Sequence, residues 1–168
     1  LVVARTEPRD DEFGSRAVFF EEKRPRSWER MKLSTFKLQD PFVFTIGREY
    51  VLGGVRVSLT KKGALKDYRT VFYKGRNLKA LRFWFAGPRR MRGIRIVRRR
   101  NGSFVVLTRP QQVSLDDPYG RGRIGIAIVA SLADIPKSIG RARLLRGLCA
   151  KDEWVGSNQA FELKNGNI

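Results

Sequence analysis

Residues 89–109 constrain the fold most, because they form the pattern of two β-strands joined by a tight turn. Asn101-Gly102 lies between two runs rich in β-branched residues, and this pair supplies the positive φ angles that a two-residue hairpin turn needs. Pairing across that turn places Arg98 opposite Val105 and Ile96 opposite Leu107. One face of the hairpin is then apolar and is predicted to face the core; it carries Ile94, Ile96, Val105 and Leu107.

The other face of this hairpin mixes cationic, aromatic and β-branched side chains. It carries Arg95, Val97, Arg99, Phe104, Val106 and Thr108. Such a mixture suits a single-stranded nucleic acid, because cations hold the phosphates and flat groups stack on bases. The alternative is the solvated outer face of an ordinary hairpin, and this segment alone does not separate the two interpretations.

The charge of the chain favours a polyanionic partner. The 168 residues include 35 lysines and arginines against 16 acidic residues, a formal net charge of +19. Such an excess repels itself unless a polyanion is close, so nucleic acid is the first expected partner and an anionic membrane surface the second. A hydrophobic content of 42% indicates a folded domain. No apolar run approaches the roughly 20 residues that cross a bilayer, so we do not expect an integral membrane protein. Of the two polyanions, nucleic acid is the expected partner, and we expect no membrane partner.

The residues that most enzymes use are scarce. The chain has no histidine and a single cysteine, Cys149, which excludes an intrachain disulfide and a zinc site built from cysteines. Carboxylates occur in pairs beside loops or chain ends, at Glu21-Glu22, Asp116-Asp117 and Asp152-Glu153. A metal-dependent nuclease needs acidic groups that converge on one point. We therefore expect a non-catalytic protein without a cofactor or metal.

Periodicity predicts strands followed by a helix, twice along the chain. Strands are expected at residues 17–22, 32–38, 42–47, 55–59, 70–73, 81–85 and 112–115, besides the hairpin. Short helices are expected at 61–68 and 141–149, while 123–136 shows both strand and helix periodicity. The predicted fold is α+β, with two antiparallel sheets of about four strands, each followed by a helix. We expect a flexible arm at 1–16, one nucleic-acid-binding domain at 17–150 and a tail at 151–168.

Four segments resemble the Whirly family of single-strand nucleic-acid-binding proteins. They are STFKLQDPFVFTIG (34–47), VRVSLTKKGALKDY (55–68), RGIRIVRRRNGSFVVLTR (92–109) and IGIAIVASLADIPKSIG (124–140), the last being similar to the closing helix of that fold. The lysine-glycine-lysine-alanine motif of the plant members is missing, so the chain is most similar to the kinetoplastid mitochondrial guide-RNA-binding proteins. The resemblance implies a Whirly-like fold and a heterotetramer with a related chain. It also implies a mitochondrial matrix location, where guide RNA would anneal with pre-mRNA during RNA editing.

The predicted RNA-binding residues are mostly arginines, whose planar guanidinium can bind a phosphate through two hydrogen bonds. They are placed on outward strand positions, at the hairpin ends and in loops, with one aromatic for stacking: Lys37, Arg56, Arg82, Arg95, Arg99, Arg98, Arg100, Arg109, Lys74, Arg76, Arg89, Arg90 and Phe104. Binding through the backbone would be largely independent of RNA sequence. The alternatives are an organellar ribosomal protein with a structural role on ribosomal RNA, and a catalytic RNA-processing factor.

Overall fold

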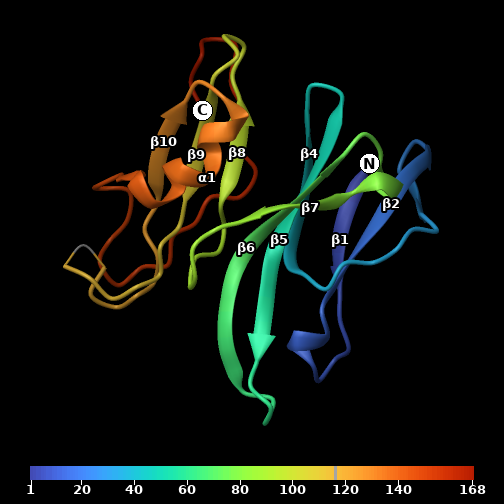
Figure 1. The fold of residues 1–168 in the computed structure, drawn as a ribbon, viewed down its shortest axis with the longest axis horizontal. Coiled ribbons are helices and arrows are strands. Elements are labelled where there is room, and N and C mark those ends of the chain that lie inside the picture. Colours follow the sequence, from blue (N-terminus) through green and yellow to red (C-terminus); the bar gives the residue numbers. More distant parts are fainter. Residues whose placement is uncertain (116) are drawn as a thin grey trace. The chain divides into compact units, whose positions relative to one another are not determined.

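The computed structural model describes residues 1–115 and 117–168 and is mainly β, with three antiparallel sheets and one short α-helix near the C-terminus (Figure 1). The chain divides into two compact units, Leu1–Phe85 and Ala86–Ile168. Both four-stranded sheets join strands that follow one another in the chain. Such four-stranded meanders are the unit that β-propellers repeat.

The first unit contains a three-stranded and a four-stranded sheet. Strands β1 (Val2–Thr6), β2 (Arg16–Arg24) and β3 (Ser27–Arg30) pair in that order, and the 3-10 turn η1 (Glu12–Gly14) precedes β2. The second sheet has the order β4 (Gln39–Ile46), β5 (Glu49–Leu59), β6 (Leu65–Gly75) and β7 (Arg82–Ala86). A further 3-10 turn, η2 (Leu78–Ala80), connects β6 to β7.

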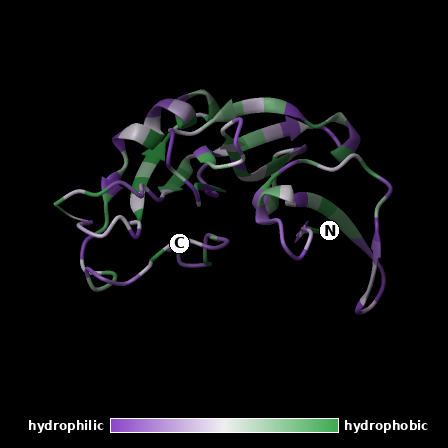
Figure 2. Cartoon of the chain, turned by 90° about the horizontal axis from the view of Figure 1, so that it is seen from below, coloured by the Kyte–Doolittle hydropathy of each residue, from purple (hydrophilic) through white to green (hydrophobic). Residues whose placement is uncertain are grey.

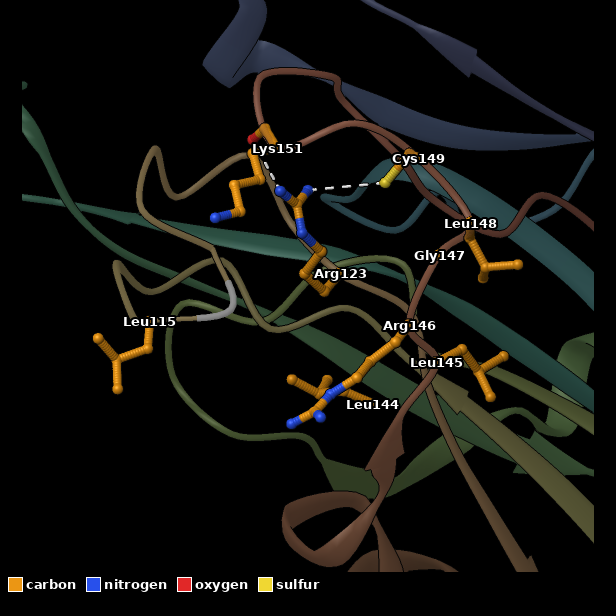
Figure 3. A pocket seen from close by; sticks show the side chains of 9 residues that line it. All are labelled: Leu115, Arg123, Leu144, Leu145, Arg146, Gly147, Leu148, Cys149 and Lys151. Atoms are coloured by element: carbon orange, nitrogen blue, oxygen red, sulfur yellow. Dashed lines mark hydrogen bonds between the residues drawn. The ribbon is translucent and has the colours of Figure 1, made fainter.

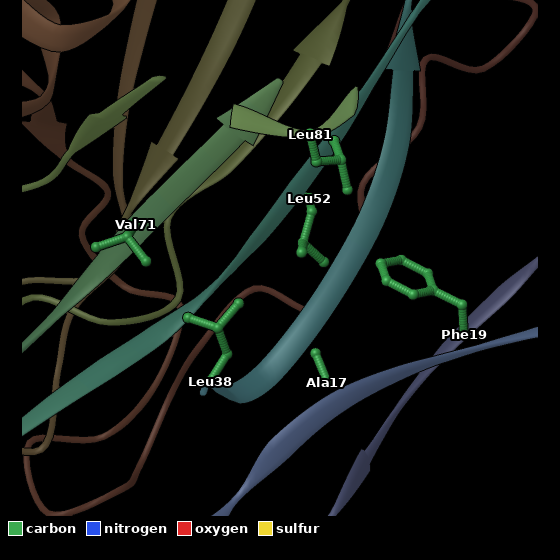
Figure 4. Packing of buried hydrophobic residues seen from close by; sticks show 6 residues of the cluster. All are labelled: Ala17, Phe19, Leu38, Leu52, Val71 and Leu81. Atoms are coloured by element: carbon green, nitrogen blue, oxygen red, sulfur yellow. The ribbon is translucent and has the colours of Figure 1, made fainter. Parts of the chain in front are cut away.

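The core of the first unit lies between residues of these two sheets. Ala17 and Phe19 of β2 meet Leu52 of β5 and Val71 of β6, and all four side chains are almost fully buried (Figure 4). Leu38 and Leu81 complete the cluster from the segments beside β4 and β7. Apolar side chains at alternate strand positions make this packing possible, because alternation places them on one face of each sheet.

The second unit contains the third sheet, in the order β11-β10-β9-β8. Its strands are β8 (Arg95–Arg98), β9 (Phe104–Thr108), β10 (Gly125–Val129) and β11 (Arg143–Leu144). All five residues of the central strand β9 are buried. The helix α1 (Ile135–Ser138) lies between the 3-10 turns η3 (Leu132–Asp134) and η4 (Ile139–Arg141). Figure 2 shows hydrophobic residues along the strands and hydrophilic residues in many of the loops.

Most predicted strands are confirmed, and both predicted helices are wrong. The strands expected at 17–22, 55–59 and 70–73 lie within β2, β5 and β6, and those expected at 42–47 and 81–85 match β4 and β7 except for one end residue each. Residues 32–38 contribute only an isolated bridge at Phe36, and 112–115 form no strand. Residues 61–68 form a turn and the start of β6, because Gly63 adopts a φ of +81° and Thr60 pairs with Ala64 across the turn. Residues 141–149 contain β11 and no α-helix.

The C-terminal half of the predicted fold also needs correction. The alternation of residues 124–128 is that of a strand, β10, and only Ile135–Ser138 of the expected closing helix is α-helical. Residues 2–6 of the predicted arm form β1, which pairs with β2. The boundaries of the predicted arm, domain and tail stay predictions.

The hairpin at residues 95–108 exists, but its register differs from the expected one. Arg98 pairs with Phe104 and Val97 with Val105, one position away from the prediction. The connection has three residues instead of two, because Arg99 N–H donates to the Ser103 carbonyl at 2.8 Å. Gly102 supplies the positive φ, +87°, that such a loop needs at its last position. The shift by one residue places Val97, instead of Ile96, in one cluster with Val105 and Leu107. The burial predicted for Ile94, Ile96, Val105 and Leu107 is confirmed.

We expect Gly102→Ala to lower the free energy of unfolding by about 1 kcal/mol, because a Cβ disfavours the left-handed conformation that the loop requires. No atom lies within 4 Å of the Cβ that would be added, so the cost would be conformational and not steric. Urea unfolding of the variant measures it. Gly140→Ala is the matched control, because its added Cβ also meets open space and its φ is not positive; equal destabilisation of both variants would contradict this account of the loop.

Candidate acid–base site

A polar network ties β1 to the start of β2. The Arg5 Nε–H lies 2.7 Å from Glu7 Oε2 and 2.9 Å from Ser15 Oγ, so one proton is shared between two acceptors. The Ser15 hydroxyl in turn lies 2.6 Å from Glu7 Oε2, to which it can donate. Ser15 is the residue that ends η1, and it is 1% exposed. A buried hydroxyl with these partners fixes the position of both side chains.

The network keeps Glu7 ionised. The hydrogen bond from Ser15 lowers the pKa of the Glu7 carboxyl, and the hydrogen bond from Arg5 lowers it further. Both donors favour the charged form of the acid. Glu7 therefore serves as a fixed anion that orients Arg5.

Asp40 joins this network from the second sheet of the same unit. The Asp40 Oδ1 oxygen lies 3.3 Å from an Arg5 terminal nitrogen, and about half of the Asp40 side chain is exposed. The residue lies within β4 where the register with β5 shifts, between the pairs Gln39–Val55 and Phe42–Gly53. β-Bulges of this kind are frequent beside active sites, where they redirect a side chain.

The backbone of Asp40 is strained. Its φ is +46°, and Arg26 and Arg90 are the other described non-glycine residues with positive φ; Asp40 alone of the three lies within a strand. The next residue is Pro41, which restricts the conformation of the residue before it. Strain of this type persists only where surrounding structure enforces it, and it is concentrated at functional sites.

Gln39 anchors the residue before the strained position. It is 6% exposed, and its side-chain amide donates to the Glu12 carbonyl at 3.0 Å. This bond joins β4 to η1, next to Ser15. Asp40 is therefore held from two directions, by Arg5 through its side chain and by Gln39 through the adjoining backbone.

These residues were not identified from the sequence. Arg5, Glu7 and Ser15 fell in the predicted arm, and Asp40 in a predicted turn between two strands. The available signal was the Asp40-Pro41 pair inside an alternating apolar run, which is typical of a bulge or edge. The partners of Asp40 are up to 35 residues away in sequence, so periodicity could not reveal them.

The predicted RNA-binding residues of the first unit do not share one face. On β6, Lys74 pairs with Val51 while Arg69 pairs with Arg56, so Lys74 and Arg56 lie on opposite faces of the sheet. Lys74 is bound to Glu49 at 2.9 Å and lies 5.3 Å from the ring centre of Trp84. Phe83 contacts Arg56, so its strand neighbour Arg82 points to the opposite face of the sheet. Arg82 is exposed, and so are Lys37 and Arg76, which lie outside the strands.

Several predicted RNA-binding residues of the second unit contact other residues of the chain or are buried. Arg99 and the backbone of Arg100 contact the Glu162 carboxylate, at 3.5 and 2.7 Å. Phe104 is 5% exposed and cannot stack on a base. Arg95 is half-buried and donates to the Ile94 carbonyl at 3.1 Å, and Arg89, Arg90 and Arg98 are exposed.

Arg109, also predicted to bind RNA, belongs to a group of arginines that hold the C-terminal segment. It donates to the carbonyls of Val155 and Arg121, the latter at 3.1 Å. Arg121 donates to the Asp152 carbonyl, and Arg123 donates to the Lys151 carbonyl at 2.7 Å. These guanidinium groups hold the C-terminal segment by donating hydrogen bonds to main-chain oxygens, so their role is structural.

A pocket of about 320 Å³ lies in the second unit, between the Arg123 region and residues 144–151 (Figure 3). Arg123 is 8% exposed, and its terminal nitrogens bond to the carbonyls of Gly122, Lys151 and Glu153 and to the Cys149 sulfur. Leucines supply much of the rest of the lining. Among the described residues no carboxylate lines the pocket, so the described lining offers no carboxylate as an acid–base group.

No group of three or more histidine, cysteine or acidic side chains among the described residues could hold a metal ion. No helix in the described part of the chain is long and apolar enough to cross a membrane. Asp116, one of the acidic pairs noted in the sequence, lies outside the described residues.

Comparisons with known proteins point away from nucleic acid. A family model described as "Protein of unknown function (DUF1861)" matches residues 1–168, and no curated protein matches the sequence. Among solved structures, the chain is similar to MPT-4, a mannose phosphorylase from Leishmania mexicana in complex with phosphate ion. The identity is 29% and the TM-score 0.78, over 90% of this chain and 45% of that one.

Two further solved structures show the same similarity. MPT-1, a GDP-Man-dependent mannosyltransferase from Leishmania mexicana, is 26% identical with a TM-score of 0.80, over 98% of this chain and 49% of that one. A hypothetical protein from Leishmania major is 28% identical with a TM-score of 0.78, over 98% and 50%. The chain thus spans about half the length of the solved chains that it matches.

These comparisons correct the expectations of family and function. The resemblance to Whirly proteins is wrong, as are the predicted guide-RNA binding, the ribosomal alternative and the absence of catalysis, because the named relatives are carbohydrate-active enzymes. The weak local matches followed strand alternation that many β-proteins share. The predicted RNA partners, related partner chain and mitochondrial matrix location depended on that resemblance and stay untested.

We expect Glu7→Gln to destabilise the protein at neutral pH and to have little effect in acid. Because the folded-state pKa of Glu7 is lowered, its stabilisation is present above the pKa that it has in the unfolded chain. That stabilisation is lost as the pH falls through the folded pKa. Urea unfolding at several pH values measures the difference between the two proteins.

Glu29→Gln is the matched control, because Glu29 is an exposed glutamate of β3 whose carboxylate, among the described residues, interacts only with Lys23 and at longer range than an ion pair. The gap between Glu7→Gln and wild type should close as the pH falls, and the control should show no such gap. A constant gap at all pH values would contradict the role given to the Glu7 charge.

Proposed function

This chain belongs to the DUF1861 family, and we propose that it takes part in transferring a mannosyl group to or from a phosphate oxygen. Two relatives support the proposal: one is a mannose phosphorylase solved with phosphate, the other a GDP-Man-dependent mannosyltransferase. Both names describe mannose chemistry in which phosphate or GDP is the acceptor or the leaving group of the mannosyl group. Because the chain spans about half of each solved relative, the activity of those whole proteins is a proposal for this one.

The reaction needs one group that handles a proton. When mannose leaves a phosphate-linked donor, the bond from the anomeric carbon to the phosphate oxygen breaks and its electron pair stays on the phosphate. The acceptor hydroxyl forms the new bond to that carbon and loses its proton to a base. Phosphate is stable as an anion and needs no proton in order to leave. A single carboxylate therefore suffices, whereas glycoside hydrolases usually need two.

Asp40 is the carboxylate that we assign to this role. Its side chain is half exposed, so a substrate hydroxyl can reach it, and Arg5 fixes one oxygen at 3.3 Å. In the phosphorolysis direction the same group, when protonated, would give its proton to the leaving sugar oxygen. Arg5 acts as a positioning residue, and Glu7 holds Arg5 in place.

The strained backbone of Asp40 is the observation that carries the assignment. A φ of +46° before proline costs stability, and glycine would relieve that cost. The Arg5–Asp40 contact is partly exposed, and such contacts contribute little net stability. An aspartate at this position is therefore better explained by chemistry than by stability.

We expect Asp40→Asn to reduce mannosyl transfer by about 10² to 10⁴-fold, the usual contribution of a proton-transferring group. Asparagine has the same size and tolerates positive φ, so the fold should be retained. The assay supplies mannose as acceptor with either mannose 1-phosphate or GDP-mannose as donor, and measures released phosphate or GDP. Asp40→Gly should lose as much activity while gaining stability in urea.

Asp10→Asn provides the control, because Asp10 is exposed and does not belong to the network around Arg5. Full activity of Asp40→Asn would remove Asp40 from the mechanism. A loss of stability in Asp40→Gly would show that the aspartate is kept for folding instead.

A further inference from the structure

A second arrangement in the first unit joins one arginine to two aromatic rings. Arg56 of β5 donates to the Tyr73 hydroxyl of β6, and its guanidinium carbon lies 6.0 Å from the Tyr73 ring centre. The same carbon lies 5.6 Å from the ring centre of Phe83 of β7. The two rings meet edge to face, at 83° and 6.1 Å between centres. Three neighbouring strands thus build one cluster.

The strand register places this cluster on one face of the sheet. Arg56 pairs with Arg69, and Tyr73 lies four residues further along β6, on the same face as Arg69. Tyr73 is packed below by Phe36, with ring centres 4.8 Å apart. The base of the cluster is therefore fixed by the core, while the Phe83 ring remains 54% exposed.

The Arg56 guanidinium is oriented but not neutralised. Its one hydrogen-bond acceptor in the described part of the chain is the Tyr73 hydroxyl, and no carboxylate there forms an ion pair with it. The neighbouring Arg69 is bound to Asp67 at 2.8 Å, so that acid is already engaged. A guanidinium held by a hydrogen bond and two rings, with N–H groups facing solvent, suits an oxyanion that accepts two parallel hydrogen bonds.

The exposed Phe83 ring supplies the second half of a ligand site. Its apolar surface, next to a cation, suits a ligand that carries both an apolar face and an anionic group. The C–H groups on one face of a hexose ring provide that apolar face, and a phosphate provides the anion. A neutral sugar would leave the guanidinium unpaired, and a free phosphate would leave the ring uncovered.

We propose that Arg56, Tyr73 and Phe83 form a hexose-phosphate site, with the phosphate on Arg56 and the sugar ring against Phe83. The inference deepens the proposed function, on which it rests for the choice of mannose, by naming the residues that bind the phosphorylated sugar. Asp40 and Arg56 lie on the neighbouring strands β4 and β5, where Gln39 pairs with Val55.

Calorimetric titration of the protein with mannose 1-phosphate, mannose and inorganic phosphate tests the site. The wild type should bind mannose 1-phosphate more tightly than either fragment. Arg56→Lys should lower the affinity for mannose 1-phosphate and for phosphate about tenfold or more, because lysine cannot form the paired hydrogen bonds. Phe83→Ala should weaken mannose 1-phosphate and leave phosphate unchanged. Tyr73→Phe should weaken the binding of both ligands less than Arg56→Lys does, because it removes only the hydroxyl that orients the guanidinium.

Two controls match these variants in type and exposure. Arg82→Lys alters the exposed arginine beside Phe83 that points to the opposite face, and Trp28→Ala removes an exposed ring from β3. Both should bind mannose 1-phosphate like the wild type. Equal weakening by the controls, unchanged affinity in Arg56→Lys and Phe83→Ala, or no binding by the wild type would each overturn the site.

Failure of this ligand site can be distinguished from failure of the proposed mannosyl transfer. Asp40→Asn should bind mannose 1-phosphate normally if the two sites have separate roles. Binding that depends on Arg56, without any mannosyl turnover, would refute the proposed transfer and keep the ligand site. Mannosyl turnover that does not depend on Arg56 or Phe83 would refute the ligand site and keep the proposed transfer.

Discussion

The contact between Arg5 and Asp40 is the interaction on which the candidate site depends. It joins strands of two different sheets, and its arginine is itself held by Glu7 and by the buried Ser15 hydroxyl. The bulge in β4 presents Asp40 in a conformation that an ordinary strand residue would not adopt. Removing the network would allow the bulge to relax, so the geometry of the carboxylate follows from the packing of β1 and β2.

Several arginines of this protein bind groups within the chain, and the net charge does not reveal this. Arg109, Arg121 and Arg123 donate to main-chain carbonyls of residues 151–155 and fix a segment with little regular structure. Arg99 and Arg100 contact Glu162, whose side chain is nearly buried. A guanidinium offers five N–H donors, so one arginine can bind several main-chain carbonyls. A high arginine content therefore indicates a polyanionic partner only where the arginines share a free surface.

The sequence was sufficient to locate many of the strands but not the turns or the site. Alternation around Phe83 identified β7, and the run of β-branched and apolar residues around Val105 identified β9, whose residues are all buried. The hairpin register was missed by one residue, since Asn101-Gly102 fits both a two-residue turn and the observed three-residue loop. Helix periodicity at 61–68 misled because Gly63 turns the chain there. The site joins residues 5, 7, 15 and 40, a constellation that only tertiary packing creates.

A phosphorus NMR time course of the wild-type protein, with mannose and each donor in turn, tests the proposed mannosyl transfer directly. Mannosyl transfer predicts that the signal of mannose 1-phosphate or GDP-mannose decays while the signal of free phosphate or GDP grows. Donor signals that stay unchanged with both compounds, in protein whose folding has been verified, would contradict it.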